Sequence, residues 1–286
     1  MTQMAGKPDS RRRVLYLCAD RPGVIAGVGK RPRFWPFCAL AAPTLVIVGL
    51  LLAWHFTIVL TKNDLLPTPW RVVLGVVELA RKGLLVRYIV ASLFRVTWGF
   101  GLAVAVGVPL GLALGWFPTM ARALNPVVQI LRPISPIAWI PLAILWFGIT
   151  DAAPIFLIFL ASVFPITVSV MAAVSNIQPV YVRAARNFGI TGMALFRRVI
   201  LPATLPQIIT SLRISLGIAW LVVVAAEMIA VTSGLGFLII DARNAGKRYD
   251  LVIAGMAMIG VIGLLLDLML RRLERFDEVR WGYSNR

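Results

Sequence analysis

Charged residues are scarce in this chain, and acidic residues are the scarcest of them. Only 14% of its 286 residues are charged, and 12 acids stand against 29 bases, whereas soluble domains average about 25% charged residues. One histidine and two cysteines exclude a multi-histidine metal site and a disulfide framework. No Gly-x-x-x-x-Gly-Lys-Ser/Thr sequence occurs, so the loop that cradles nucleotide phosphates is missing. We therefore expect no ATP hydrolysis by this chain.

The composition is instead rich in apolar residues and in basic residues. The chain is 59% hydrophobic, its mean hydropathy is +0.86, and its net charge is +17. The arginines flank long apolar runs and do not form one stripe with aromatic residues, which argues against nucleic-acid binding. We interpret the basic excess as a signal of membrane orientation and of contact with anionic lipid.

The apolar runs predict an all-α polytopic membrane protein with six transmembrane helices. About 20 apolar residues in a helix span the hydrocarbon core of a bilayer, and six runs approach or exceed that length. Four prolines interrupt the third run, and the third and fourth runs meet in a tight turn that predicts a helical hairpin. The six runs are Cys38–Leu60, Tyr88–Phe117, Ala123–Ile149, Ala152–Val174, Leu205–Ala230 and Leu251–Leu270.

The distribution of lysine and arginine predicts that both termini are cytoplasmic. With that orientation the inner segments hold 18 basic residues and the outer segments hold 8, in agreement with the positive-inside rule. We expect four regions along the chain. They are a cytoplasmic basic tail at 1–37, the first transmembrane helix with a periplasmic amphipathic segment at 38–87, a transmembrane domain at 88–272 with an inner loop at 175–204, and a cytoplasmic tail at 273–286.

The inner loop between the fourth and fifth runs has an unusual sequence, RAARNFGITGMALFRRVILP, from Arg183 to Pro202. It carries four arginines and no acid. Glycines at 189 and 192 permit a sharp turn between two short helices, and Pro202 is expected to end the second helix. The composition allows two interpretations, an ordinary basic loop or a docking element for another protein.

The spacing within this loop resembles the Glu-Ala-Ala signature of ABC-transporter membrane subunits of the binding-protein-dependent importer type. Ala184 and Ala185 match the two alanines, Gly189 matches the glycine, and Leu201-Pro202 ends the pattern in register. Arg183 replaces the usual glutamate, and Val199 replaces an isoleucine. The stretches LRPISPIAWIPLAILWFGI and AAEMIAVTSGLGFLI are similar to permeases of the nitrate, sulfonate, taurine and bicarbonate branch, as is LPTPWRVV.

This resemblance implies a type I ABC importer permease fold in the cell inner membrane and an ATP-driven importer of a small anion. Its implied partners are separate ATP-binding subunits, a second permease copy in a homodimer, and a periplasmic or lipid-anchored substrate-binding protein. No cofactor would be bound by this chain, and ATP would be used by the partner. The loop would couple to the ATPase through Arg183, Ala184, Ala185, Arg186, Gly189, Gly192, Leu201 and Pro202.

Polar residues inside the spans are functional candidates because they are costly in a bilayer. In the proline-broken third run, Arg132, Ser135 and Trp139 either line a transport pathway or serve kink formation and helix packing. Glu227 either lines the pathway or holds a neighbouring helix or loop at the outer gate. Arg95 is expected at the interface, and Arg213 is expected to extend toward the inner surface.

Glycines recur in the second run, and we expect them to make helix-packing contacts. They are Gly99, Gly101, Gly107, Gly111 and Gly115. Two rival functions remain at this stage. An ion-coupled secondary transporter would work without an ATPase partner, although acids are scarce within the spans. An intramembrane enzyme would need a Ser/Asp/His constellation, which a single histidine makes hard to build.

Overall fold

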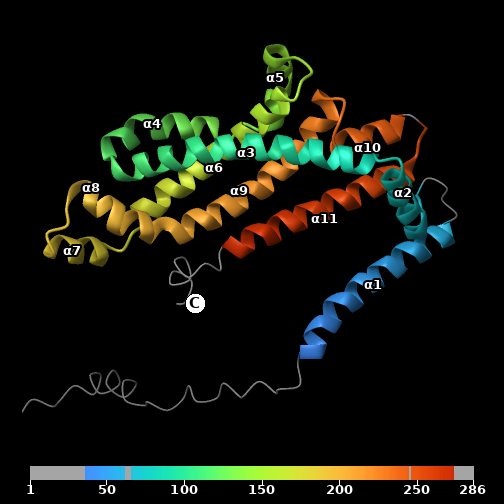
Figure 1. The fold of residues 1–286 in the computed structure, drawn as a ribbon, viewed down its shortest axis with the longest axis horizontal. Coiled ribbons are helices and arrows are strands. Elements are labelled where there is room, and N and C mark those ends of the chain that lie inside the picture. Colours follow the sequence, from blue (N-terminus) through green and yellow to red (C-terminus); the bar gives the residue numbers. More distant parts are fainter. Residues whose placement is uncertain (1–35, 62–65, 245, 274–286) are drawn as a thin grey trace, which may run out of the picture. The chain divides into compact units, whose positions relative to one another are not determined.

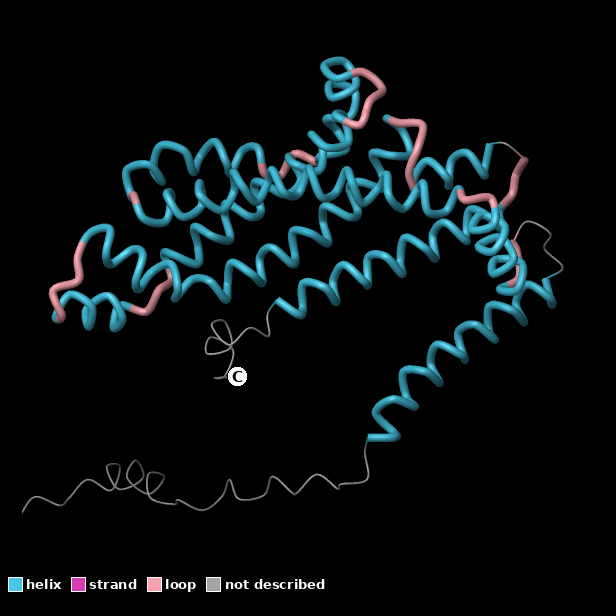
Figure 2. Tube along the Cα trace, in the orientation of Figure 1, coloured by secondary structure: helices cyan, strands magenta, loops and turns pink. Residues whose placement is uncertain are grey.

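The structure is a computed structural model that describes residues 36–61, 66–244 and 246–273. The chain divides into two compact units, residues 1–53 and 54–286, and helix α1 (Pro36–Thr61) contains the boundary. Apart from residues 36, 37 and 273, the predicted tails at 1–37 and 273–286 lie outside the described residues. Within the second unit the described residues form helices joined by short turns, and none of them is in a strand (Figures 1 and 2).

Three long helices form the centre of the second unit. Helix α3 (Leu84–Trp116) packs along α6 (Ala152–Ser175), and α6 packs in turn along α9 (Leu201–Ala230). Four of the five predicted packing glycines lie at the α3–α6 contact, where a Cβ atom on Gly111 would be 2.7 Å from the Thr167 carbonyl oxygen. Gly101 is the exception, because open space surrounds it. The missing side chains let the two backbones approach closely.

The third apolar run is broken, as its prolines predict. Helix α4 (Pro118–Leu131) ends just before Pro133, and a short 3₁₀ turn η2 (Pro136–Trp139) and helix α5 (Ile140–Phe147) follow. The segment Pro136–Phe147 is bent by 83° from α4. The turn at residues 148–151 then leads into α6, which gives the predicted hairpin. Among the described residues five helices are long and apolar enough to span a membrane, and this bent pair would be the sixth.

The fifth predicted span is longer than expected. Helices α8 (Gly192–Leu195), η3 (Phe196–Ile200) and α9 follow one another without a break from Gly192 to Ala230. The prediction that Pro202 ends a helix is therefore wrong. Residues Phe196–Ile200 form a π turn, and Pro202 lies in the first turn of α9, a position where the missing N–H of proline is tolerated.

Shorter helices lie at the two ends of this bundle. Helices α7 (Pro179–Asn187) and α8 project at one end, while α10 (Leu235–Asn244) and α2 (Pro69–Arg81) lie at the other (Figure 1). Helix α11 (Tyr249–Leu273) packs on α10, α2 and α9. We call these the α7–α8 end and the α10 end. The predicted amphipathic helix after the first span is α2, which buries Val72, Gly75 and Leu79.

Candidate functional site

A cavity of about 480 Å³ opens between the α4–α5 break, the middle of α6 and the first half of α9. It brings together residues that are far apart in the sequence. The apolar members of its lining are Leu131, Ile134, Pro136, Trp139, Leu160, Ala161, Phe164, Pro165, Ile214 and Ile218. The polar members are Arg132, Ser169, Gln207, Thr210, Ser211 and Ser215. The lining that the described residues form contains no carboxylate.

Helix α9 gives this cavity a polar stripe. The other α9 residues in the lining lie 3, 4, 7, 8 and 11 positions after Gln207. This spacing places them on one face of the helix. Thr210 and Ser211 donate hydrogen bonds to the carbonyls of Pro206 and Ile208, at 3.1 and 2.8 Å. The stripe lies within a helix that is otherwise apolar enough to span a membrane. Polar groups at such positions face a water-filled cavity or another protein group.

The predicted pathway residues divide between this cavity and other places. Arg132, directly after the end of α4, and Trp139, in η2, both line the cavity. Ser135 is exposed beside them in the break but is not among the lining residues. Glu227 is completely buried on α9 and also lies outside the lining. The α9 stripe was not predicted from the sequence, although its polar residues recur with the period of a helix.

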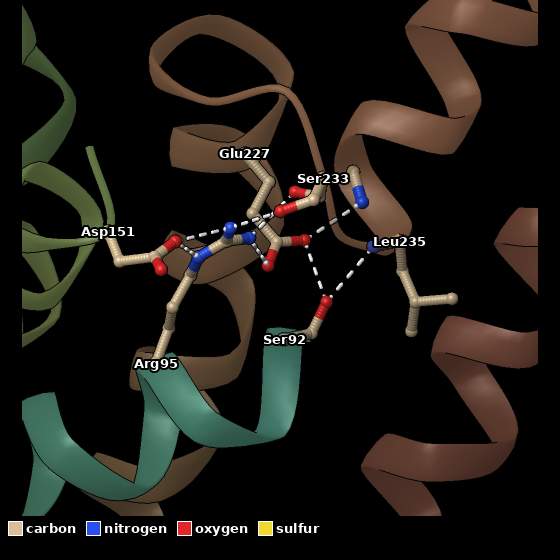
Figure 3. Close-up of polar contacts among 7 residues, drawn as sticks. Ser92, Arg95, Asp151, Glu227, Ser233 and Leu235 are labelled. Carbon is tan, nitrogen blue, oxygen red and sulfur yellow. Dashed lines mark hydrogen bonds and ion pairs between the residues drawn. The ribbon is translucent and has the colours of Figure 1, made fainter. Parts of the chain in front are cut away.

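Glu227 belongs instead to a buried ion-pair network at the α10 end. Arg95 of α3 has only 1% of its surface exposed, so the expectation that it lies at the interface is wrong. All five N–H groups of its guanidinium are used (Figure 3). One Nη1 hydrogen bond of 2.7 Å goes to Glu227 Oε1 and another of 2.7 Å to the Ser233 carbonyl. Nε and Nη2 donate to Asp151 Oδ1 at 2.9 and 2.6 Å, and Nη2 also donates to Ser233 Oγ at 2.6 Å.

The second carboxylate oxygen of Glu227 holds the start of α10. Glu227 Oε2 accepts hydrogen bonds from Ser92 Oγ at 2.8 Å and from the Gly236 N–H at 3.0 Å. Ser92 Oγ in turn accepts the Leu235 N–H at 3.0 Å. A carboxylate at a helix N-terminus satisfies N–H groups that have no partner within the helix. The network therefore joins α3, α9, α10 and the turn before α6.

Glycine is required where the loop before α10 crosses Glu227. Gly234 has φ +110°, a conformation that side chains rarely adopt, and a Cβ atom there would lie 2.3 Å from Glu227 Cδ. A Cβ atom on Gly236 would lie 2.3 Å from the Val224 carbonyl oxygen. The glycines of SGLGFLI thus let the loop lie directly on the buried carboxylate. Of the two interpretations of Glu227, these contacts fit the one in which it holds a neighbouring loop.

At the α7–α8 end the predicted coupling segment forms two short helices around a glycine turn. Helix α7 ends in a Schellman motif, in which the Ile190 N–H bonds the Ala185 carbonyl at 3.0 Å and the Gly189 N–H bonds the Arg186 carbonyl at 2.9 Å. Gly189 has φ +74° and Gly192 has φ +57°, so both supply the left-handed conformation that the turn needs. Here the local sequence pattern and the backbone agree.

The coupling residues present a basic surface with apolar side chains on it. Arg183, Ala184 and Arg186 are exposed, and Ala185 is buried against Leu195 and Ile200. Phe188 is 84% exposed and Met193 is 63% exposed, although both are large and apolar. Leu201 and Pro202 lie in the first turn of α9, beyond the π turn. The surface combines unpaired arginines, as judged among the described residues, with apolar groups that a partner could bury.

Two further groups of charged residues tie helices together. Arg213 bonds Asp267 of α11 at 2.6 Å, so it does not simply extend toward the surface. At the α10 end Arg248 pairs with Glu78 of α2 and with Asp250, each at 2.7 Å. The hydrogen bond from Arg248, helped by Lys82, lowers the pKa of Glu78 to about 2.

The fold, the apolar helices and the projecting α7–α8 segment define a membrane-embedded transport subunit. Residues 107–276 match the family model described as binding-protein-dependent transport system inner membrane component. The chain belongs to this family and is the permease subunit of an ABC importer, a multi-pass inner-membrane protein.

Several individual proteins are similar to this chain in sequence or in structure. It is 37% identical to the taurine transport system permease protein TauC of Escherichia coli K12, over 84% of this chain and 90% of that one. It is 39% identical to the nitrate import permease protein NrtB of Leptolyngbya laminosa, over 63% of this chain and 64% of that one. Among solved structures, the inward-facing MetNI methionine ABC transporter matches with a TM-score of 0.59 over 68% of this chain and 97% of its own, at 22% identity, which supports the fold.

Proposed function

We propose that this permease moves a small anion of the nitrate, sulfonate, taurine or bicarbonate class into the cell, driven by ATP hydrolysis in separate subunits. The observation that carries the coupling part is the α7–α8 segment. It is a glycine-turned surface with exposed Phe188 and exposed arginines, on a chain whose sequence contains no phosphate-binding loop. Energy must therefore reach the transport pathway through a contact with another protein.

The anion part of the proposal is supported by the charges around the cavity. Among the described residues of its lining Arg132 alone is charged, and the other polar members are hydroxyls and an amide. Relatives that carry taurine and nitrate in their names point to the same class. The cavity is our candidate for the substrate pathway, and alternating access would open it toward one side of the membrane at a time. In this scheme Glu227 is a positioning residue near the outer gate.

The orientation predicted from lysine and arginine sets the arrangement of the partners. The termini and the α7–α8 end face the cytoplasm, where two ATP-binding subunits dock on two permease copies. A substrate-binding protein delivers the anion at the α10 end. The absence of an acid from residues 175–204 suggests that the ATPase presents carboxylates toward Arg183, at the position where the Glu-Ala-Ala signature has its glutamate.

Co-purification with the ATPase tests the coupling role. Gly189→Asp places a carboxylate on the exposed turn of this surface, where it should repel the carboxylates that we expect on the ATPase, so the ATPase should be lost. Arg183→Glu should weaken the same complex by charge repulsion. Gly246→Asp is the matched control, because it lies at the α10 end and Gly246 has no positive φ.

Uptake into proteoliposomes containing the complete transporter tests the transport role. The expected result is anion uptake that needs ATP and the binding protein and that Gly189→Asp abolishes. Uptake by the permease alone that an uncoupler abolishes would favour the ion-coupled alternative. Normal retention of the ATPase by Gly189→Asp would count against docking through α7–α8.

A further inference from the structure

A second hollow lies at the α10 end, between α2 and the start of α11. Its volume is about 380 Å³, and it shares no lining residue with the cavity beside the α4–α5 break. Three bases and two acids line it, together with apolar residues of α2. These charged residues are Arg71, Lys247, Arg248, Glu78 and Asp250. We call this site the α2–α11 hollow.

The acids of the hollow already have a cationic partner, but two of its bases have no anionic one. Arg248 bonds both Glu78 and Asp250, each at 2.7 Å. Arg71 and Lys247 are exposed, and neither makes a hydrogen bond or an ion pair with any residue in the described parts of the chain. The hollow therefore carries a surplus of positive charge, which favours an anionic ligand with oxygen acceptors.

The backbone holds Lys247 at this hollow in a costly conformation. Its φ is +52°, and among the described residues no other residue except glycine has a positive φ. The N–H of Arg248 bonds the carbonyl of Ala242 at 3.0 Å, and the N–H of Tyr249 bonds the carbonyl of Lys247 at 2.9 Å, so the turn around the lysine is fixed. A left-handed conformation of this kind is uncommon outside glycine and is concentrated at ligand-binding positions.

Helix α2 has an exposed apolar face that begins at the rim of the hollow. Its buried residues Val72, Gly75 and Leu79 occupy one side of the helix. Because successive residues of a helix are 100° apart, its large exposed apolar residues lie together on a different side. They are Trp70, Val73, Leu74 and Val77. Leu74 also lines the hollow, so the charged site and the exposed apolar face are continuous.

This face lies at the ends of two membrane spans. Helix α3 begins at Leu84, directly after α2, and α11 begins at Tyr249, beside the hollow. Both helices are long and apolar enough to span a membrane, and α2 runs across their ends (Figure 1). The exposed face of α2 therefore lies at the depth where hydrocarbon meets the headgroups, which is the position of an interfacial amphipathic helix.

We propose that the α2–α11 hollow binds the headgroup of an anionic phospholipid. Arg71 and Lys247 bind the phosphate, and the acyl chains lie across Leu74 and Trp70. A soluble anion would leave the apolar face of α2 in water, whereas a lipid covers the face and satisfies the cations together. The predicted orientation places this end outside, where the positive-inside rule gives no reason for cations. The site is independent of the transported substrate, so it goes beyond the proposed function.

Lipid binding to the complete transporter tests this site. The transporter is purified in detergent, stripped of lipid and titrated with phosphatidylglycerol or with phosphatidylcholine of the same acyl chains, and native mass spectrometry gives the affinity of the tightest bound lipid. Phosphatidylglycerol should bind about tenfold more tightly than phosphatidylcholine. The double variant Arg71→Gln/Lys247→Gln should bind phosphatidylglycerol about thirtyfold more weakly, because each cation near a membrane surface contributes roughly fivefold. Its affinity for phosphatidylcholine should not change.

The matched control is Arg87→Gln/Arg243→Gln, which removes the same charge from two exposed residues outside the lining of the hollow. It should keep the affinity for phosphatidylglycerol. An equal loss in both double variants would overturn the site, and equal binding of the two lipids would overturn the anionic headgroup. Release of phosphatidylglycerol by millimolar inorganic phosphate would overturn the lipid as the occupant. Loss of the binding protein or of the second permease copy from Arg71→Gln/Lys247→Gln, with unchanged lipid affinity, would assign the surface to a protein partner instead.

Discussion

Replacing Arg95 by methionine should destabilise the second unit by about 3–5 kcal/mol, the cost of leaving one partner of a buried ion pair without the other. Glu227 is completely buried and its Oε1 atom bonds Arg95 at 2.7 Å. Without the guanidinium it would be a carboxylate held only by Ser92 and the Gly236 N–H. The side chain of Asp151 is 58% exposed, so that residue would return to water at little cost.

A second substitution separates the cost of the unpaired buried carboxylate from the cost of lost packing. In the double variant Arg95→Met/Glu227→Gln no charge remains buried, and the amide oxygen of the glutamine can still accept from Ser92 Oγ and the Gly236 N–H. We expect more than half of the lost stability to return, because neutral replacement of both partners is much less costly than removal of one. Asp151→Asn should cost less than about 1 kcal/mol, as exposed pairs do.

Thermal unfolding of the detergent-purified transporter measures these differences. A chain of this size shifts its melting temperature by about 2–4 °C per kcal/mol, so Arg95→Met should melt roughly 6–20 °C lower. The reasoning would be refuted if the double variant melted at the temperature of Arg95→Met. It would also be refuted if Asp151→Asn cost as much as Arg95→Met, since the exposed contact would then carry the stability.

Two smaller perturbations test other contacts. Gly111→Ala should lower stability by about 1–3 kcal/mol, because its Cβ atom would lie 2.7 Å from both the Thr167 carbonyl oxygen and Val170 Cβ, whereas Gly101→Ala, in open space, should be neutral or stabilising in the same unfolding assay. The lowered pKa of Glu78 means that its contact with Arg248 stabilises α2 above the ordinary pKa of 4.5 and is lost as pH falls toward about 2. Hydrogen exchange in α2, corrected for its intrinsic pH dependence, should therefore rise across that range in the unchanged protein and stay flat in Glu78→Gln.

The sequence was sufficient to predict features that depend on local pattern. The lengths of the apolar runs predicted the positions of the spans, and the prolines predicted the break after α4. The spacing of the two alanines and the glycine in residues 184–189 predicted the turn after α7. Each of these signals acts within a few residues, because helix propensity, proline geometry and the left-handed glycine conformation are local properties. The error at Pro202 has the same explanation, since a π turn changes the register of a helix without leaving a composition signal.

Features that depend on contacts between residues far apart in the chain could not be predicted from the sequence. Arg95 and Glu227 are 132 positions apart, and nothing near Arg95 distinguishes a buried guanidinium from one at the interface. The missed stripe on α9 was accessible in principle, because Gln207, Thr210, Ser211 and Ser215 follow the helical period. What the sequence alone could not show was that the α4–α5 break brings Arg132 to the same cavity.

The polar groups at the α10 end and those in the cavity differ in their hydrogen bonding. At the α10 end every guanidinium donor of Arg95 and both carboxylate oxygens of Glu227 are bonded within the protein, and such a network is costly to disturb and holds a loop in place. In the cavity, by contrast, the side chains of Arg132 and Gln207 are exposed and have no hydrogen-bond partner among the described residues. Both groups lie within the spans and look alike in the sequence. Their hydrogen-bond partners distinguish the positioning role proposed for Glu227 from the pathway role proposed for the cavity, and the Arg95 double variant tests the first of these roles.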